Sequence, residues 1–229
     1  MVLTSAHTFN DYVSKHLVPF VQSLVTPTVT WVDAVWDTYT EDNLKTLTHQ
    51  RRGLGPRTRI GDGQTRIPKH DWNTGFLKNI DNKRELFPFL GEQLVKQDLD
   101  GRLLLSTNQE SVLSNKQHDV SALRPCNHTE ADTRIMLNLA HAAQQRHQVA
   151  LVRTVDSDVV ILAIHFFSSL GLSQLWVCLG SGKKIRDIPI HSLSAQLGPS
   201  RCMALPLFHA VTGCDTVSQF LGCGKKSAW

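Results

Sequence analysis

Two aspartates lie two positions apart where an apolar run begins, in the stretch "TVDSDVVILAIHFF" (154–167). If a strand continues through both, Asp156 and Asp158 point to the same side, because side chains alternate along a strand. Carboxylates this close repel each other unless a cation is present, and hard divalent cations such as Mg²⁺ or Mn²⁺ prefer oxygen ligands. The alternative is that Asp158 or Ser157 caps the following helix, which leaves Asp156 unexplained.

Glu130 and Asp132 form a second pair with the same spacing. In the middle of a helix this spacing turns the two side chains about 200° apart, so they could not share a face. At a helix start both acids would lie in the first turn, where Thr129 and Asp132 also resemble a capping box. First-turn acids stabilise the helix dipole without any further function, and this alternative stays open.

Two single acids extend the set. Asp37 closes the apolar stretch "TVTWVDAVWD" (28–37), and Asp215 follows a glycine in "TGCDT" (212–216). Each is commonplace by itself at a strand end or a turn. Several such acids together could hold two divalent ions about 4 Å apart, which activate water and stabilise the leaving oxygen in phosphodiester cleavage.

The basic residues are concentrated between His49 and His70. This segment contains six Lys or Arg residues against Asp62 alone, whereas the whole chain has a formal net charge of only +4. A flexible basic loop at about 49–70 could bind the phosphates of a nucleic acid. A solvated loop without a partner is the alternative.

Length and composition favour one folded domain over 1–229. Hydrophobic residues make up 41% of the chain and charged residues 19%, which is enough apolar surface to form a core. Single domains reach about 250 residues before their cores divide. We therefore expect a single folded domain with one core.

The cysteines and the apolar segments favour an intracellular protein without membrane association. The five cysteines form no CxxC pair, so we expect reduced thiols. The N-terminus lacks the pattern of a signal peptide, and polar residues interrupt the apolar stretch 159–179. We favour the nucleus over the cytoplasm. Two sets of possible zinc ligands lack the paired spacing of structural zinc sites: Cys126 with His128, and Cys202, His209, Cys214 and Cys223.

The apolar spacing predicts helices that alternate with strands. Helices are predicted at 10–25, 72–96, 128–145, from 159 onward and at 202–213. Strands are predicted at 28–37, 101–107, 148–156 and 175–180, with a hairpin at 181–190. This alternation is typical of an α/β sandwich with a mainly parallel sheet.

The order and surroundings of the acids resemble a known family. "EADTR" (130–134), "DSDVV" (156–160) and "TGCDT", preceded by "DAVWDTYTEDNLKTLTHQRRG" (33–53), are similar to the acidic motifs of the flap endonuclease family, within the PIN-like 5′-nuclease domains. The chain looks most like a group of multi-copy animal proteins that carry this core. The resemblance covers about 30–229 and implies a PIN-like three-layer sandwich around a mainly parallel central sheet.

The resemblance implies metal-dependent chemistry for the acidic pairs. Glu130 and Asp132 match the family's Glu-x-Glu/Asp pair, Asp156 and Asp158 its Asp-x-Asp pair, and Asp215 the acid of its Gly-x-Asp turn. The implied activity is hydrolysis of DNA or RNA phosphodiesters with Mg²⁺ or Mn²⁺, by a two-ion mechanism. The residues expected to hold metal and to act in catalysis are Asp37, Glu130, Asp132, Asp156, Asp158 and Asp215.

The resemblance also implies a phosphate-binding region. Asp37 resembles the acid that closes the family's second core strand. Lys45, Arg51 and Arg52, which follow it, resemble the basic helix and arch that engage the scissile phosphate. The residues expected to bind nucleic acid are Lys45, Arg51, Arg52, Arg57 and Arg59.

Two departures from the family keep other functions open. Family members begin with a strand that carries another metal-binding Asp, where this chain offers only Asp11 in a polar, helix-like setting. They also continue past the Gly-x-Asp turn into a helix-turn-helix element, whereas this chain stops at "GCGKKSAW" (222–229). We expect a chain shortened at both ends relative to the family. The alternatives are a catalytically weakened nucleic-acid-binding or scaffold protein and, ranked lower, a small-molecule phosphohydrolase.

Overall fold

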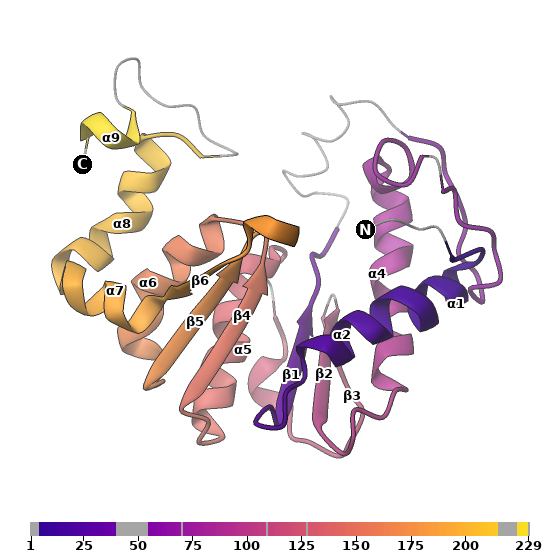
Figure 1. Cartoon of the computed structure of the whole chain (residues 1–229), viewed down its shortest axis with the longest axis horizontal. Coiled ribbons are helices and arrows are strands. Elements are labelled where there is room, and N and C mark those ends of the chain that lie inside the picture. Colours follow the sequence, from indigo (N-terminus) through magenta and orange to yellow (C-terminus); the bar gives the residue numbers. More distant parts are fainter. Residues whose placement is uncertain are drawn as a thin grey trace. The chain divides into compact units, whose positions relative to one another are not determined.

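The chain divides into two compact units, Met1–Ala131 and Asp132–Trp229, each described here by itself. The computed structural model describes residues 5–39, 55–69, 71–108, 110–126, 128–214 and 224–228. Both units contain helices and a small sheet, so the chain is an α/β protein, as predicted (Figure 1). The single domain predicted over 1–229 stays a prediction.

The first unit begins with helices and contains three strands. Its elements in chain order are α1 (Phe9–Tyr12), the π-helix η1 (Val13–Leu17), α2 (Val18–Leu24), β1 (Trp31–Val35), the 3₁₀ helix η2 (Phe76–Lys78), α4 (Ile80–Val95), β2 (Leu103–Asn108), β3 (Ser111–Ser114) and the 3₁₀ helix η3 (Ser121–Leu123).

The second unit contains most of α5, which starts at the last residue of the first unit. Its elements are α5 (Ala131–Gln144), β4 (Val149–Thr154), α6 (Asp158–Leu170), β5 (Gln174–Leu179), the 3₁₀ helix η4 (Gly182–Lys184), β6 (Arg186–Pro189), α7 (Ile190–Leu197), α8 (Pro199–Val211) and α9 (Lys225–Ala228).

The two sheets share one topology. In the first, β1 pairs in parallel with β2, and β2 pairs antiparallel with β3. In the second, β4 pairs in parallel with β5, and β5 pairs antiparallel with β6. Within each parallel pair a helix lies between the strands in sequence, α4 or α6, as a parallel connection requires. Each described sheet is therefore small and mixed, and the predicted mainly parallel three-layer sandwich is not confirmed beyond α/β.

The α4 helix begins where Asn79 caps it. The Asn79 side-chain oxygen accepts the backbone N–H groups of Asp81 and Asn82, which lack partners inside the helix. The helix packs on β2 next to Gly91, where an added Cβ would lie 2.5 Å from Ser106 Oγ. A larger residue at this position would therefore displace the helix or the serine.

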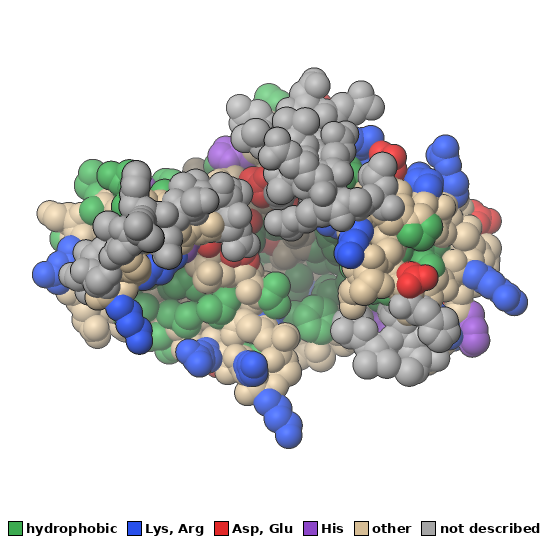
Figure 2. All heavy atoms as spheres, turned by 90° about the horizontal axis from the view of Figure 1, so that it is seen from above, with side chains coloured by type: hydrophobic (Ala, Val, Ile, Leu, Met, Phe, Trp, Pro, Cys, Tyr) green, Lys and Arg blue, Asp and Glu red, His purple; other side chains and the backbone are tan. Residues whose placement is uncertain are grey.

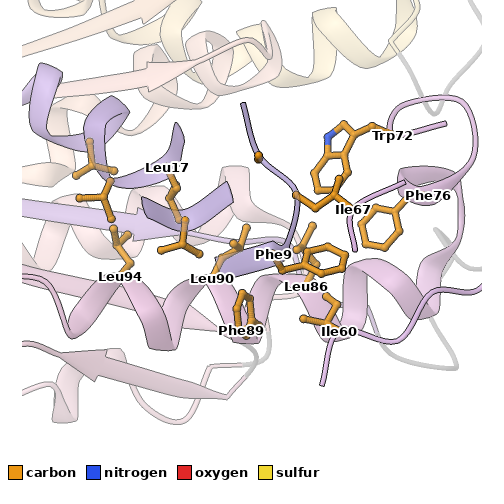
Figure 3. Packing of buried hydrophobic residues seen from close by; sticks show 14 of the residues in the cluster. Phe9, Leu17, Ile60, Ile67, Trp72, Phe76, Leu86, Phe89, Leu90 and Leu94 are labelled. Carbon is orange, nitrogen blue, oxygen red and sulfur yellow. The ribbon is translucent and has the colours of Figure 1, made fainter. Parts of the chain in front are cut away.

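The core of the first unit lies between α4 and the N-terminal helices (Figure 3). Leu86, Leu90 and Leu94 recur at four-residue spacing, so they form one apolar side of α4. Phe9 packs against them, and its ring also contacts Phe76, with centroids 5.4 Å apart. Burial of each such side chain stabilises the fold by about 1.5–3 kcal/mol. This core fixes α4 against the N-terminal helices.

Residues 55–69 of the predicted basic loop pack against α1 and α4. Ile60 and Ile67 are buried, and Thr8 forms an isolated antiparallel bridge with Arg66. Arg57 forms an ion pair with Glu85 of α4, whose other carboxylate oxygen accepts the Ile60 N–H at 2.8 Å. We expected a flexible arm, and this part of it is held by backbone and side-chain hydrogen bonds.

A separate apolar core holds the second unit together. Val159 and Ala163 of α6 are buried with Leu175 of β5 and Ile190 of α7. The α6 helix ends at Gly171, which has a φ of 76° and so adopts the left-handed conformation that favours glycine after a helix. The apolar stretch that begins at 159 is thus a helix followed by strand β5, as predicted.

Most of the predicted elements are confirmed, with shifted ends. The predicted helix at 10–25 is a continuous run with a π turn before Pro19, which has no N–H to donate. The predicted helix at 72–96 begins only at Ile80, because Asn79 caps it. Strand β3 and helix α7 were not predicted; both are short, with four and eight residues.

The contact of α4 with the basic segment predicts a pH-dependent loss of stability in a Glu85→Gln variant. Burial raises the pKa of Glu85, but the hydrogen bonds from Arg57, Gly61 and Ile60 outweigh it, so the pKa lies below its usual value. A lowered folded-state pKa stabilises the fold above the unfolded-state pKa of about 4.3, and this contribution is lost as the pH falls through the folded-state pKa. We expect the variant to lose about 1–2 kcal/mol of unfolding free energy at pH 7.

Urea denaturation at several pH values would measure this effect. The deficit should shrink below about pH 4, where Glu85 becomes protonated in the unfolded chain. The exposed Glu92 lies on the same helix, so Glu92→Gln is the matched control and should change little. A deficit of constant size from pH 7 to pH 3 would contradict the ionic origin.

Candidate metal centre

Asp37 lies just after β1 in a segment that is hydrogen-bonded on both sides. The backbone N–H of Trp36 donates to Thr107 O at 3.3 Å, and its indole Nε1 donates to Ser106 Oγ at 3.1 Å. The backbone N–H of Thr38 donates to Thr129 O at 2.8 Å. The backbone around Asp37 is therefore fixed between strand β2 and the residue before the acidic pair.

The Asp37 carboxylate caps helix α5. Its Oδ1 accepts the backbone N–H of Ala131, the first residue of the helix, at 3.0 Å. The first N–H groups of a helix have no partner within it, and the helix dipole favours negative charge at this end. A residue from the end of one strand thus stabilises the start of a helix that follows 94 residues later.

Three of the predicted carboxylates meet at this helix start. Asp37, Glu130 and Asp132 each offer an oxygen, and these oxygens lie within 4.8 Å of one another. Glu130 precedes the helix and Asp132 lies in its first turn, so the 200° separation of a regular helix does not apply to them. All three side chains are half-buried. The structure therefore brings together three of the six acids that were expected to hold metal.

The donor set fits a hard divalent cation. Carboxylate oxygens are the ligands of Mg²⁺, Mn²⁺ and Ca²⁺, whereas zinc sites usually include His or Cys. Two ligand oxygens on opposite sides of an ion are about 4.2 Å apart for Mg²⁺ and about 4.8 Å apart for Ca²⁺. Three carboxylate oxygens within 4.8 Å of one another can therefore coordinate either ion. Within the described ranges, no other group of three His, Cys, Asp or Glu residues has this spacing.

The second pair of aspartates follows β4 without belonging to it. The strand ends at Thr154, so the alternation of a strand does not align Asp156 with Asp158 as predicted. Instead, Asp156 Oδ1 accepts the backbone N–H of Asp158 at 2.8 Å at the start of α6. Neither Ser157 nor Asp158 caps the helix as the alternative expected; Asp156 accepts an N–H at the helix start instead, and Asp158 makes another contact.

Asp158 pairs with a histidine of α8. His209 Nε2 lies 2.9 Å from Asp158 Oδ1, and the two side chains are 14% and 33% exposed. His209 is partly buried on this helix. Its contact with a predicted metal ligand was not foreseen, because 51 residues separate the two.

Two of the five predicted nucleic-acid-binding residues lie within the described part of the chain, and three lie outside it. Arg57 and Arg59 are both exposed, and Arg57 also pairs with Glu85 and donates to Asn82 Oδ1 at 2.8 Å. On the face shown in Figure 2, the Lys and Arg side chains of the described residues stand out at several separate points. Four predicted residues lie outside the described residues: Asp215, Lys45, Arg51 and Arg52.

Asp11 has a local structural role. It completes a capping box with Thr8 at the start of α1, and its Oδ1 pairs with Lys15 at 2.7 Å. The hydrogen bond from Lys15, followed by that from the His7 backbone, holds the pKa of Asp11 well below its usual value. Asp11 therefore acts as a helix cap, consistent with the helix-like setting expected from the sequence.

Two residues beside Asp37 were missed at the level of the sequence. The Tyr39 hydroxyl donates to Asp37 Oδ2 at 3.3 Å, and Lys83 Nζ donates to the Tyr39 oxygen at 3.3 Å. Tyr39 lies only two residues from Asp37, so it had a local signal. Lys83 had none, because it comes from α4, 44 residues further along the chain.

The crowding of three carboxylates predicts opposite effects of an Asp37→Asn variant on stability and on metal binding. Asn keeps an oxygen that can accept the Ala131 N–H, but it removes one of three negative charges that repel each other. We expect the unfolding free energy in EDTA to be unchanged or higher. Mn²⁺ binding should weaken at least about tenfold, which removes about 1.4 kcal/mol of stabilisation by excess Mn²⁺.

Urea denaturation with and without Mn²⁺ would measure both effects. Asp71→Asn, at an exposed aspartate of the same unit, is the matched control and should respond to Mn²⁺ like the original protein. If the Asp37→Asn protein is stabilised by Mn²⁺ as strongly as this control, Asp37 is not a ligand.

The capping contact of Asp156 predicts that Ala and Asn substitutions differ. Asp156→Ala removes the acceptor for the Asp158 N–H and should cost about 1 kcal/mol of unfolding free energy. Asp156→Asn keeps an acceptor and should lower the unfolding free energy by only a few tenths of a kcal/mol. Denaturation of both variants in EDTA would check this, and equal losses would argue against the cap.

Among the residues that the structure describes, no helix combines the length and the apolar character needed to cross a membrane. Comparisons of the chain with protein-family models, with curated proteins and with solved structures find no match. The evidence for function is therefore the chemistry of the acidic group itself.

Proposed function

We propose that this chain is a Mg²⁺- or Mn²⁺-dependent nuclease that hydrolyses phosphodiester bonds of DNA or RNA. The observation that carries the proposal is the meeting of Asp37, Glu130 and Asp132 at the start of α5. A divalent ion held there would polarise a phosphoryl oxygen and lower the pKa of a bound water. The three carboxylates would bind and orient it, and the helix start would stabilise their negative charge.

The finer parts of the proposal rest on the sequence resemblance. A second ion would require further acids, for which Asp156, Asp158 and Asp215 are the candidates. The basic residues Arg57 and Arg59, together with those at 45, 51 and 52, would bind the phosphate backbone. The proposed fold is a PIN-like three-layer sandwich with a mainly parallel central sheet, supported by the parallel strand pair in each unit.

A second candidate function is nucleic-acid binding without catalysis. It is favoured by the second acidic pair, because Asp156 caps α6 and Asp158 pairs with His209. If Asp156 and Asp158 serve only these structural contacts, they do not bind a second metal ion, and the protein would hold one ion at the triad. Such a protein would bind nucleic acid and a divalent ion without cutting.

Cleavage assays with matched variants would separate the two candidates. We expect the full chain to cut at least one of labelled single-stranded, duplex or flapped DNA or RNA in Mn²⁺, and to lose this activity in EDTA. Asp132→Asn and Glu130→Gln should reduce the rate to about one hundredth or less, because each removes a proposed metal ligand. The exposed Asp71→Asn variant should cut normally.

The outcome without cleavage is also informative. Circular dichroism and urea denaturation would establish that each protein is folded. Binding of labelled nucleic acid by a folded protein that does not cut would favour the second candidate. Cleavage that survives in Asp132→Asn and Glu130→Gln would place the activity elsewhere in the preparation and would refute the proposal.

A further inference from the structure

Lys83, Tyr39 and Asp37 form a chain of hydrogen bonds that ends at the acidic triad. Lys83 Nζ lies 3.3 Å from the Tyr39 hydroxyl oxygen, which lies 3.3 Å from Asp37 Oδ2. A lysine ammonium has only donors, so the tyrosine oxygen must accept from it. The tyrosine proton can then be donated to the carboxylate, which only accepts. The chain of donors therefore points from the cation to the acid.

Tyr39 is held in place beside Asp37 by its ring contacts and by a backbone hydrogen bond. The residue is 6% exposed, and its ring lies against Phe87 with centroids 6.0 Å apart. Its carbonyl oxygen accepts a hydrogen bond from Arg84 Nε at 2.9 Å, and Lys83 Nζ lies 5.1 Å from its ring centroid. Two consecutive residues of α4 thus hold Tyr39 from two directions.

The phenol remains a donor in this environment. A tyrosine hydroxyl has an ordinary pKa of about 10, so it carries its proton at neutral pH. In a buried chain, each hydrogen bond also polarises the next one.

Both oxygens of Asp37 are consequently oriented from outside the triad. Oδ1 accepts the Ala131 N–H and Oδ2 accepts the Tyr39 hydroxyl. Each carboxylate oxygen has a second lone pair, so both contacts leave room for a metal. Partners of this kind orient metal ligands, and their loss typically costs about 10–100-fold in metal affinity.

We infer that Tyr39 and Lys83 are positioning residues of the metal centre, which orient the Asp37 carboxylate and offset part of the negative charge of the triad. The inference rests on the proposed function, because it assigns a hard divalent cation to the same site. Tyr39 acts directly on Asp37, and Lys83 acts through Tyr39. The effects of losing them should therefore not be additive.

Mn²⁺ binding by the full chain would test the inference. Free Mn²⁺ can be measured by electron paramagnetic resonance during titration of the original protein and of Tyr39→Phe, Lys83→Met and the double variant. We expect each single variant to bind Mn²⁺ about tenfold or more weakly. The double variant should be no weaker than Tyr39→Phe, and Lys83→Arg should restore most of the affinity, because it keeps the charge and the donors.

The chain offers a matched control for each substitution. Tyr12 is the only other tyrosine, and its half-buried ring packs against Trp72, so Tyr12→Phe tests the loss of a tyrosine hydroxyl away from the triad. Lys96 is exposed at the end of α4, about 20 Å along the helix from Lys83, so Lys96→Met tests the loss of a charge. Both controls should bind Mn²⁺ like the original protein.

The outcomes separate this inference from the proposed function. Equal Mn²⁺ affinity in the original protein and in Tyr39→Phe would refute the positioning role. Additive losses of Mn²⁺ affinity in the double variant would refute the inference that Lys83 acts through Tyr39. Mn²⁺ binding that depends on Tyr39 without any cleavage would uphold the inference and refute the nuclease. A folded original protein that binds no Mn²⁺ would overturn both.

Discussion

The hydrogen bond from the Ala131 N–H to Asp37 Oδ1 is the constraint on which the candidate site depends. It joins the end of β1 to the start of α5 and brings one carboxylate to the two that the helix start already carries. Because an N-terminal N–H group needs an acceptor, the same contact stabilises the helix and assembles the acids. Structure and proposed chemistry therefore share one interaction.

Negative charge is the main electrostatic cost of this arrangement. Three half-buried carboxylates within 4.8 Å repel one another, and burial weakens the screening by water. The helix start, the Tyr39 hydroxyl and the Lys83 ammonium offset part of that repulsion. A divalent cation would offset more of it. Asp156 and Asp158 differ from the triad because each already has a partner within the protein. Asp156 accepts the N–H of Asp158, and the Asp158 carboxylate contacts His209.

Local sequence patterns predicted the larger elements well. The apolar periodicity of 10–25 and of 159 onward corresponds to observed helices, because each has an apolar side that its unit buries. Short elements such as β3 and α7 carry too few residues for a clear period. Helix α5 also buries Arg134, Asn138 and His141 at spacings of four and three, polar positions that periodicity assigns to solvent.

The sequence by itself determined that the chain is α/β, that acids lie near strand ends and at a helix start, and that Glu130 and Asp132 lie at the same helix start. These features depend on residues close together in the chain. Only the tertiary structure decided that Asp37 joins this pair, that Lys83 donates to the neighbouring Tyr39 hydroxyl, and that Asp158 contacts His209. Such contacts join residues 44 to 94 positions apart, and packing, which local periodicity does not encode, brings them together.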